Sequence, residues 1–197
     1  MSKYKNIKSE HQLRSLVFDD YFKNKDVSWE QEIESIDFII TDKKSRIKKN
    51  TGADKHYVWM ETKKSKTDHY IMLVQLLLTI KKPYDKNEYI VPNYIGCFDT
   101  EQIIFVPMKL LQEVMHDNDI KWNITPSNTK DEYFLKIQNK LKYKLHGIKD
   151  VKIFSFDSND DEIKDFIQQN VYKGVTENKF QITEHNFVKF VFYIIIF

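Results

Sequence analysis

The hydrophobic positions of the first third of the chain change from a helical to a strand-like period. Ser9 is a favourable N-cap residue, and apolar residues recur at helical spacing after it, at Leu13, Leu16, Val17, Tyr21 and Phe22. This spacing predicts a helix over residues 9–23. Short runs of apolar residues then predict strands over residues 27–33, 35–41 and 56–63. The polar, lysine-rich segment 42–55, with its turn signal Gly52, is typical of an exposed hairpin tip or loop.

The rest of the chain alternates between helical and strand-like patterns. A helix capped by Thr67 or Asp68 is predicted to run to about Lys81. Apolar residues occupy nearly all sides of this helix, as in a helix buried against a sheet. Pro83 and Pro92 are expected to bracket a loop. The remaining patterns predict strands over residues 93–98, 102–106 and 151–156, a turn over 99–101, and helices over 108–116, 130–145 and 157–169.

This order of elements predicts the fold class. Helix–strand–strand–strand–helix–strand–strand favours an α/β or α+β fold with a mixed central sheet flanked by helices. We expect a core over residues 1–107, ending near Pro107, and a helical or α+β extension over residues 108–197 that packs on or continues it. From the apolar run 190–197 we expect the chain to be a fragment or a truncated relative of a longer protein; in that case this tail is either a core strand or an exposed hydrophobic segment.

Composition narrows the functional classes only slightly. Hydrophobic residues make up 41% of the chain and aromatic residues 14%, as in a packed globular protein. The net charge of +2 is too small to indicate a nucleic-acid partner by itself. A single cysteine, Cys97, excludes an internal disulfide and a Cys-rich zinc site. The longest apolar runs are shorter than the ~20 residues of a membrane-spanning helix, and no signal peptide is visible, so we expect a cytoplasmic protein without a membrane partner.

Two carboxylates and a lysine form the candidate site. Glu61 and Lys63 share one face of their predicted strand because side chains alternate, and Asp37 lies among apolar residues of the preceding strand. If these strands pair, Asp37, Glu61 and the backbone carbonyl of Thr62 offer hard oxygen ligands for Mg²⁺ or Mn²⁺. Lys63 would then orient the attacking water and stabilise negative charge on a phosphodiester. The alternative is a solvated strand edge, because Glu-x-Lys arises often by chance in a chain with 30% charged residues.

These residues resemble the PD-(D/E)xK nuclease superfamily. The resemblance rests on Ser9-Glu10-His11-Gln12-Leu13-Arg14, Ile36-Asp37-Phe38 and Trp59-Met60-Glu61-Thr62-Lys63. In that superfamily the first helix often contributes a glutamate, which matches Glu10, and the later helix a glutamine, which matches Gln75. Two later runs, Gly96-Cys97-Phe98-Asp99-Thr100-Glu101-Gln102-Ile103-Ile104-Phe105 and Trp122-Asn123-Ile124-Thr125-Pro126-Ser127-Asn128, resemble the N-terminal region of bacterial restriction–modification enzymes that join a nuclease to an adenine methyltransferase. Ile36 replaces the usual proline, and no methyltransferase motif is present.

The resemblance implies a magnesium-dependent restriction endonuclease of bacterial defence, with Asp37, Glu61, Lys63, Glu10 and Gln75 in the active site. It implies double-stranded DNA as substrate and a methyltransferase or specificity module, in cis or in trans, as partner; a homodimer is also left open. Basic residues near the site are the candidate DNA ligands: Lys43, Lys44, Arg46, Lys48, Lys49, Lys64 and Lys66.

Purely structural roles remain alternatives for several of these residues. Glu10 and Arg14 have the spacing of an ordinary ion pair on one helix. Gln75 could be a core glutamine whose polar groups are hydrogen-bonded, and the lysines could belong to a solvated loop. The whole chain could likewise be a catalytically inactive DNA-binding or protein-interaction domain derived from the same fold.

Overall fold

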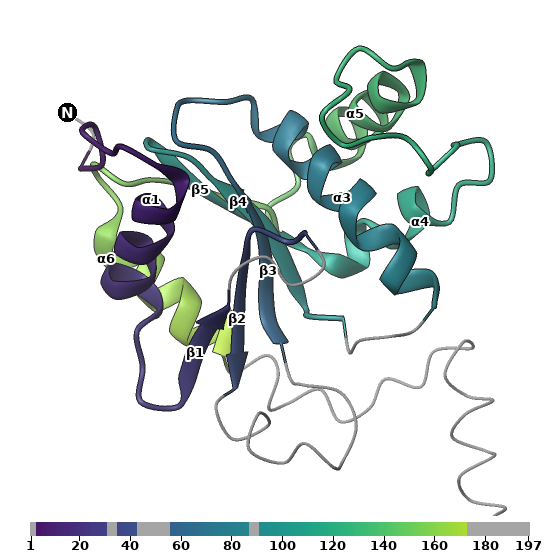
Figure 1. Cartoon of the computed structure of the whole chain (residues 1–197). Coiled ribbons are helices and arrows are strands. Elements are labelled where there is room, and N and C mark those ends of the chain that lie inside the picture. The colour runs from purple at the N-terminus through teal and green to yellow at the C-terminus, as the bar shows by residue number, and fades with distance from the viewer. Residues whose placement is uncertain (1–2, 31–34, 43–55, 87–90, 173–197) are drawn as a thin grey trace, which may run out of the picture.

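A mixed sheet of six strands forms the centre of the protein and carries helices on both faces, as the computed structural model shows (Figure 1). The structure describes residues 3–30, 35–42, 56–86 and 91–172. The strands are β1 (Val27–Glu30), β2 (Phe38–Asp42), β3 (His56–Thr62), β4 (Tyr94–Phe98), β5 (Gln102–Pro107) and β6 (Lys152–Ser155), in this spatial order. The prediction of a mixed sheet flanked by helices is thus confirmed.

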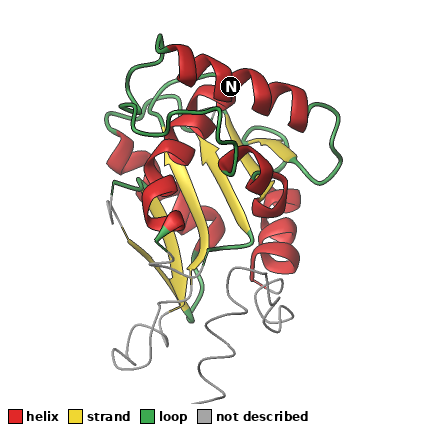
Figure 2. Cartoon of the chain, turned by 90° about the vertical axis from the view of Figure 1, so that its right-hand side faces the viewer, coloured by secondary structure: helices red, strands yellow, loops and turns green. Residues whose placement is uncertain are grey.

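Two groups of helices enclose the sheet. The helices are α1 (Glu10–Val17), the π-helix η1 (Phe18–Phe22), α3 (His69–Asp85), the 3₁₀ turn η2 (Met108–Leu110), α4 (Gln112–Met115), α5 (Glu132–Leu145), α6 (Asp160–Phe166) and the π-helix η3 (Ile167–Tyr172). In Figure 1, α1 and α6 lie on one side of the sheet, and α3, α4 and α5 lie on the other. Figure 2 shows the strands between these layers from the side of α3 and α5.

Each face of the sheet has its own hydrophobic core because strand side chains alternate between faces. Trp59, Ile95 and Ile104 pack with the apolar face of α3 and α5. Met60 and Phe105 pack with residues of α1, η1 and α6 on the opposite face. Trp59 and Ile95 on one face and Met60 on the other are almost completely buried, so β3 and β4 are packed on both sides near the candidate site.

The strand pairing places the candidate site at the C-terminal end of β3. β2 and β3 are antiparallel, and β3 and β4 are parallel, joined by the crossover helix α3. Every other neighbouring pair of strands in the described sheet is antiparallel. Phe38 lies opposite Met60, so the next residues toward this end are Asp37 and Glu61, while Glu61 lies opposite Cys97 on β4.

Several predicted boundaries were wrong. α3 continues through Pro83 to Asp85 instead of ending near Lys81. Pro83 removes one backbone amide donor from the last turns of the helix, and the burial of its ring offsets part of that loss. The helix expected over residues 108–116 is split into η2 and α4. β2 begins at Phe38, which leaves Asp37 in a bend just before the strand. The lysine-rich segment 43–55 and the tail 190–197 lie outside the described residues.

The C-terminal part of the described chain is attached to the same sheet. β6 pairs with β5, with Gln102 opposite Ser155, and α5 packs against α3 in a shared core. No helix among the described residues combines the length and the apolar character needed to cross a membrane.

Candidate active site

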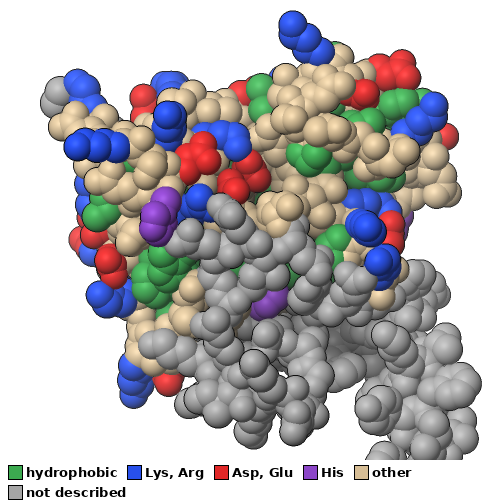
Figure 3. All heavy atoms as spheres, in the orientation of Figure 1, with side chains coloured by type: hydrophobic (Ala, Val, Ile, Leu, Met, Phe, Trp, Pro, Cys, Tyr) green, Lys and Arg blue, Asp and Glu red, His purple; other side chains and the backbone are tan. Residues whose placement is uncertain are grey.

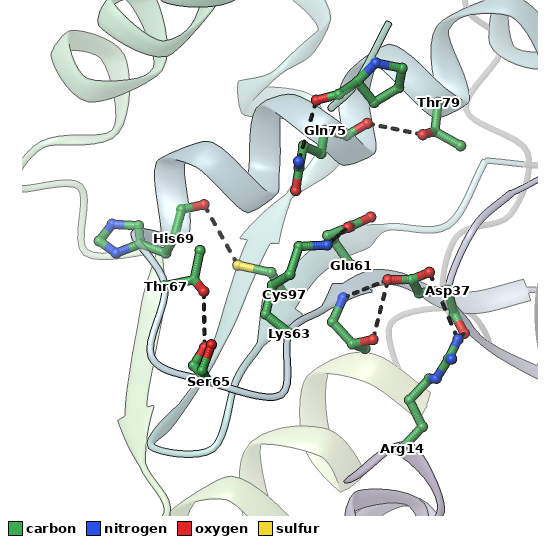
Figure 4. Close-up of polar contacts among 12 residues, drawn as sticks. Arg14, Asp37, Glu61, Lys63, Ser65, Thr67, His69, Gln75, Thr79 and Cys97 are labelled. Carbon is green, nitrogen blue, oxygen red and sulfur yellow. Dashed lines mark hydrogen bonds and ion pairs between the residues drawn. The ribbon is translucent and has the colours of Figure 1, made fainter. Parts of the chain in front are cut away.

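Asp37, Glu61 and Lys63 come together from two strand ends, as Figure 4 shows. Glu61 is the next-to-last residue of β3 and Lys63 follows the strand, with its amide donating to the Phe98 carbonyl of β4 over 3.1 Å. Lys63 Nζ donates to Glu61 Oε1 in a direct ion pair. The two side chains lie on one face of the strand, as the alternation of side chains predicted. Asp37 joins them from the bend before β2.

The Asp37 carboxylate is held by the backbone and side chain of Thr62. The Thr62 amide donates to Asp37 Oδ2 over 3.0 Å, and the Thr62 hydroxyl donates to the same oxygen over 3.2 Å. Thr62 is fully buried, so these donors have a fixed position. The residue whose carbonyl was expected to serve as a ligand is therefore in direct contact with Asp37.

Arg14 of α1 reaches the same carboxylate from the other side. Its guanidinium Nη1 donates to the Asp37 backbone carbonyl over 2.7 Å and lies 3.7 Å from Asp37 Oδ1. The Arg14 side chain is only 7% exposed, whereas the Asp37 side chain is 22% exposed. The structure thus connects the first helix to the site through Arg14, a residue for which the sequence suggested an ordinary helix pair.

Negative charge is in excess around Glu61. Burial, and next the charge of Asp37, raise the pKa of Glu61 to about 7 against the opposing effect of its bond to Lys63, and Glu10 adds a further increase. Burial by itself would lower the pKa of Lys63, but its hydrogen bond to Glu61 and the surrounding carboxylates outweigh burial and raise this pKa. Lys63 therefore stays charged at neutral pH, while Glu61 is poised between its two protonation states.

The donor set suits a hard divalent cation. Two converging carboxylates are the ligands that Mg²⁺ and Mn²⁺ prefer, and a cation between them would relieve the repulsion that raises the pKa of Glu61. Among the described residues, no three His, Cys, Asp or Glu side chains are grouped so that together they could hold a metal ion. A cation here would thus depend on Asp37, Glu61 and a backbone oxygen such as that of Thr62.

Glu10 and Gln75, the other two active-site residues that the resemblance implied, differ in their relation to this site. Glu10, on α1, acts on both Glu61 and Lys63 through its charge. Gln75, on α3, donates from Nε2 to the carbonyl of Pro126 over 3.3 Å, and its buried Oε1 has no hydrogen-bond partner among the described residues. The hydrogen bond that the structure gives Gln75 therefore leads to the loop before α5 rather than to β3.

Two of the predicted DNA ligands lie among the described residues. Lys64 and Lys66 are exposed directly after Lys63, and Lys66 Nζ forms an ion pair with Glu101 at 2.8 Å. Acidic and basic side chains are interspersed on the face shown in Figure 3. The other five predicted ligands, Lys43, Lys44, Arg46, Lys48 and Lys49, lie outside the described residues.

Sequence reasoning missed one buried acid close to the site. Asp99 follows β4 and is completely buried, with Oδ2 accepting from the amide of Thr67 over 2.9 Å. Its Oδ1 accepts from the amides of Glu101 and Gln102, over 2.7 and 3.1 Å. Asp99 thereby ties the β4–β5 turn to the loop that follows Lys63. The sequence could have revealed this role, because Asp99 stands at the start of a predicted turn, where aspartate often accepts hydrogen bonds from nearby backbone amides.

Two surface hollows lie away from the carboxylates. A cleft of about 200 Å³ is bordered by His69, His146 and Ile153, and an open groove runs between α4 and α5 beside Lys140. Neither is lined by Asp37, Glu61 or Lys63. The candidate site is thus defined by its charged groups at the strand ends and not by either hollow.

Comparisons of the chain with protein-family models, with curated proteins and with solved structures found no match.

Proposed function

We propose that this chain is a divalent-metal-dependent nuclease domain of the PD-(D/E)xK type that hydrolyses DNA phosphodiesters. The observation that carries the proposal is the convergence of Asp37, Glu61 and Lys63 at one end of the β2–β3 pair. The surrounding order, α1, three strands, α3 and a fourth strand parallel to β3, is the arrangement expected around such a site and supports a restriction-endonuclease-like fold.

Each residue of the site has a definite role in this proposal. Asp37, Glu61 and the Thr62 carbonyl would hold Mg²⁺ or Mn²⁺, which when bound supplies Lewis-acid stabilisation of phosphate charge and a more acidic water. Lys63 stays protonated because its pKa is raised, so it provides positive charge and hydrogen-bond donors beside the phosphate. Thr62 holds the carboxylate of Asp37 in place.

The proposed substrate is double-stranded DNA, and the proposed setting is bacterial restriction–modification. This part rests on the resemblance of the sequence motifs and on the exposed lysines that follow the site. Lys64 and Lys66 lie where the backbone of a bound nucleic acid could be contacted by positive charge. Target specificity would reside in a partner module, in cis or in trans.

The test is Mg²⁺-dependent cleavage of plasmid DNA by the wild type, Glu61→Ala and Lys63→Ala. We expect each variant to lose about 100-fold or more in rate, the size of effect found when a group that stabilises transition-state charge is removed. Lys109→Ala is the matched control because it removes an exposed lysine in η2, at the other end of the sheet, and should keep most of the activity. Equal cleavage by the wild type, Glu61→Ala and Lys63→Ala would refute the site.

One observation favours a second candidate, a catalytically inactive DNA-binding or interaction domain. Lys63 pairs directly with Glu61, and both donors of Thr62 bind Asp37, so the polar groups partly satisfy one another without a metal. A wild-type protein that binds duplex DNA with the same affinity in EDTA and in Mg²⁺, and never cleaves it, would establish this candidate.

A further inference from the structure

Arg14 is an unusual residue in this chain. The sequence contains 29 lysines and only two arginines, Arg14 and Arg46. Most lysines of the described part are at the surface. Arg14, in contrast, is buried, as are Leu13 and Val17 of the same helix, α1. A chain that uses lysine almost everywhere thus has arginine at a buried position beside the candidate site.

The contacts of Arg14 show what a guanidinium can do there. Nη1 donates to the backbone carbonyl of Asp37 over 2.7 Å and lies 3.7 Å from the Asp37 Oδ1 atom. Thr62 binds the other carboxylate oxygen, Oδ2. Asp37 is therefore held at its backbone and on both sides of its carboxylate, by residues from α1 and β3.

Asp37 lies at a short break in the pairing of the sheet. The residue lies in a bend between Ile36, which forms an isolated β-bridge, and Phe38, the first residue of β2, and Ser35 has a positive φ of 69°. Non-glycine residues with positive φ are uncommon and persist where surrounding contacts enforce them. Outside the regular ladder, the direction of the Asp37 carboxylate depends on the groups that bind it.

We propose that Arg14 is a positioning residue, which fixes the backbone and the carboxylate of Asp37 so that Asp37 and Glu61 can share one divalent cation. This inference rests on the proposed function, because it presumes that the two carboxylates bind a metal. Arg14 itself is too buried to contact a DNA phosphate and acts through Asp37.

The action of Arg14 is geometric rather than electrostatic. A positive charge 3.7 Å from Asp37 Oδ1 would weaken the binding of a cation, so its charge alone would oppose metal affinity. The rigid, planar guanidinium places several donors at fixed angles, which the single ammonium of lysine does not reproduce. Lysine should therefore fail to replace arginine at this position, although it preserves the charge.

The experiment measures Mn²⁺ binding to the whole chain by electron paramagnetic resonance, for the wild type, Arg14→Lys and Arg14→Met. We expect Mn²⁺ affinity to fall about 10- to 100-fold in both variants, the loss typical when a group that orients a metal ligand is removed. Lys23→Met, which removes a positive charge from an exposed ion pair just after η1, should leave the affinity unchanged. In cleavage assays the Mn²⁺ concentration at half-maximal rate should rise, and KM for DNA should stay the same.

The outcomes separate this inference from the proposed function. Wild-type affinity in Arg14→Met would show that Arg14 is merely structural, while the nuclease proposal would stand if the wild type cleaves DNA. Full rescue by Arg14→Lys would also overturn the geometric role. A wild type that binds no Mn²⁺ would refute both proposals. If Arg14→Met does not fold, which circular dichroism would reveal, Arg14→Lys decides alone.

Discussion

Two buried carboxylates lie at the ends of neighbouring strands, and their surroundings differ sharply. Asp99, after β4, accepts three backbone amide hydrogen bonds from the turn and loop around it. Glu61, near the end of β3, is paired with the side chain of Lys63 and faces the charge of Asp37. The carboxylate oxygens of Asp99 are occupied by backbone amides, whereas burial and the like charge of Asp37 raise the pKa of Glu61 to about 7.

This difference separates a structural acid from a candidate catalytic one. Asp99 completes the local fold, and its oxygens are occupied by the main chain. Glu61 is 6% exposed, so it is nearly as well buried, yet its carboxylate is bound by the side chain of Lys63. Buried groups with a strongly shifted pKa and a specific charged partner are candidates for function. Burial alone would not have distinguished the two acids.

The largest effect that tests this comparison is the loss of stability in Asp99→Ala. Removing the carboxylate leaves three amides without their acceptor in a buried turn, and hydrogen bonds to a charged group contribute about 1.5–3 kcal/mol each. Because the three bonds share one carboxylate, their contributions do not add in full, and we expect the free energy of unfolding in urea to fall by about 3–5 kcal/mol. Asp131→Ala, at the N-cap of α5, is the control and should cost about 1 kcal/mol. Equal losses would mean that Asp99 is an ordinary cap.

Glu61 should instead make the protein less stable as the pH rises. Its pKa is about 7 in the folded chain and near 4.5 when unfolded, so between these values the folded state binds the extra proton. Stability from this group is complete below pH 4.5 and is lost as the pH rises through 7, by about 3 kcal/mol in total. Urea unfolding across this range should show the decline in the wild type and a flatter profile in Glu61→Gln.

The control for that profile is Glu132→Gln, which changes an exposed glutamate at the start of α5. It should retain the wild-type decline with pH. If Glu61→Gln also retains the full decline, the shifted carboxyl is not Glu61, and the contrast with Asp99 loses its basis.

A smaller effect is expected from Thr62→Val. The variant removes the hydroxyl that donates to Asp37 Oδ2 but keeps the amide donor and most of the side-chain volume. The free energy of unfolding should fall by about 1 kcal/mol, the usual contribution of one buried hydrogen bond. Thr67→Val, whose hydroxyl binds the carbonyl of Ser65 at the surface, is the matched change. If Thr67→Val loses more unfolding free energy than Thr62→Val, the hydrogen bond to Asp37 does not stabilise the fold more than a surface hydrogen bond does.

The smallest effect should come from Lys66→Ala, beside the Asp99 turn. Lys66 forms an exposed ion pair with Glu101, and such pairs add little to stability, so the unfolding midpoint should not move. If Lys66 contacts a phosphate, DNA affinity should weaken, and the slope of log affinity against log salt should decrease in magnitude by about one. An unchanged salt dependence would exclude Lys66 from the DNA contacts.

Local patterns in the sequence determined much of the fold. The apolar periods predicted the order of the elements, the buried character of α3 and the turn between β4 and β5, all of which the structure contains. Strand alternation placed Glu61 and Lys63 on one face, and their direct contact follows from that spacing of two residues. These features depend on interactions between residues that are close in sequence, and a single chain displays them directly.

Contacts between distant segments were decided by the tertiary structure alone. The sequence placed Asp37 within a strand, but the residue lies in a bend just before β2 and contacts Thr62 and Arg14, 25 and 23 residues away in sequence. The contrast between Glu61 and Asp99 has the same origin. Both are acids beside apolar strands, and only the packing of the chain determines which one meets backbone amides and which one meets another charge. Burial and electrostatic repulsion depend on three-dimensional neighbours, which no local pattern specifies.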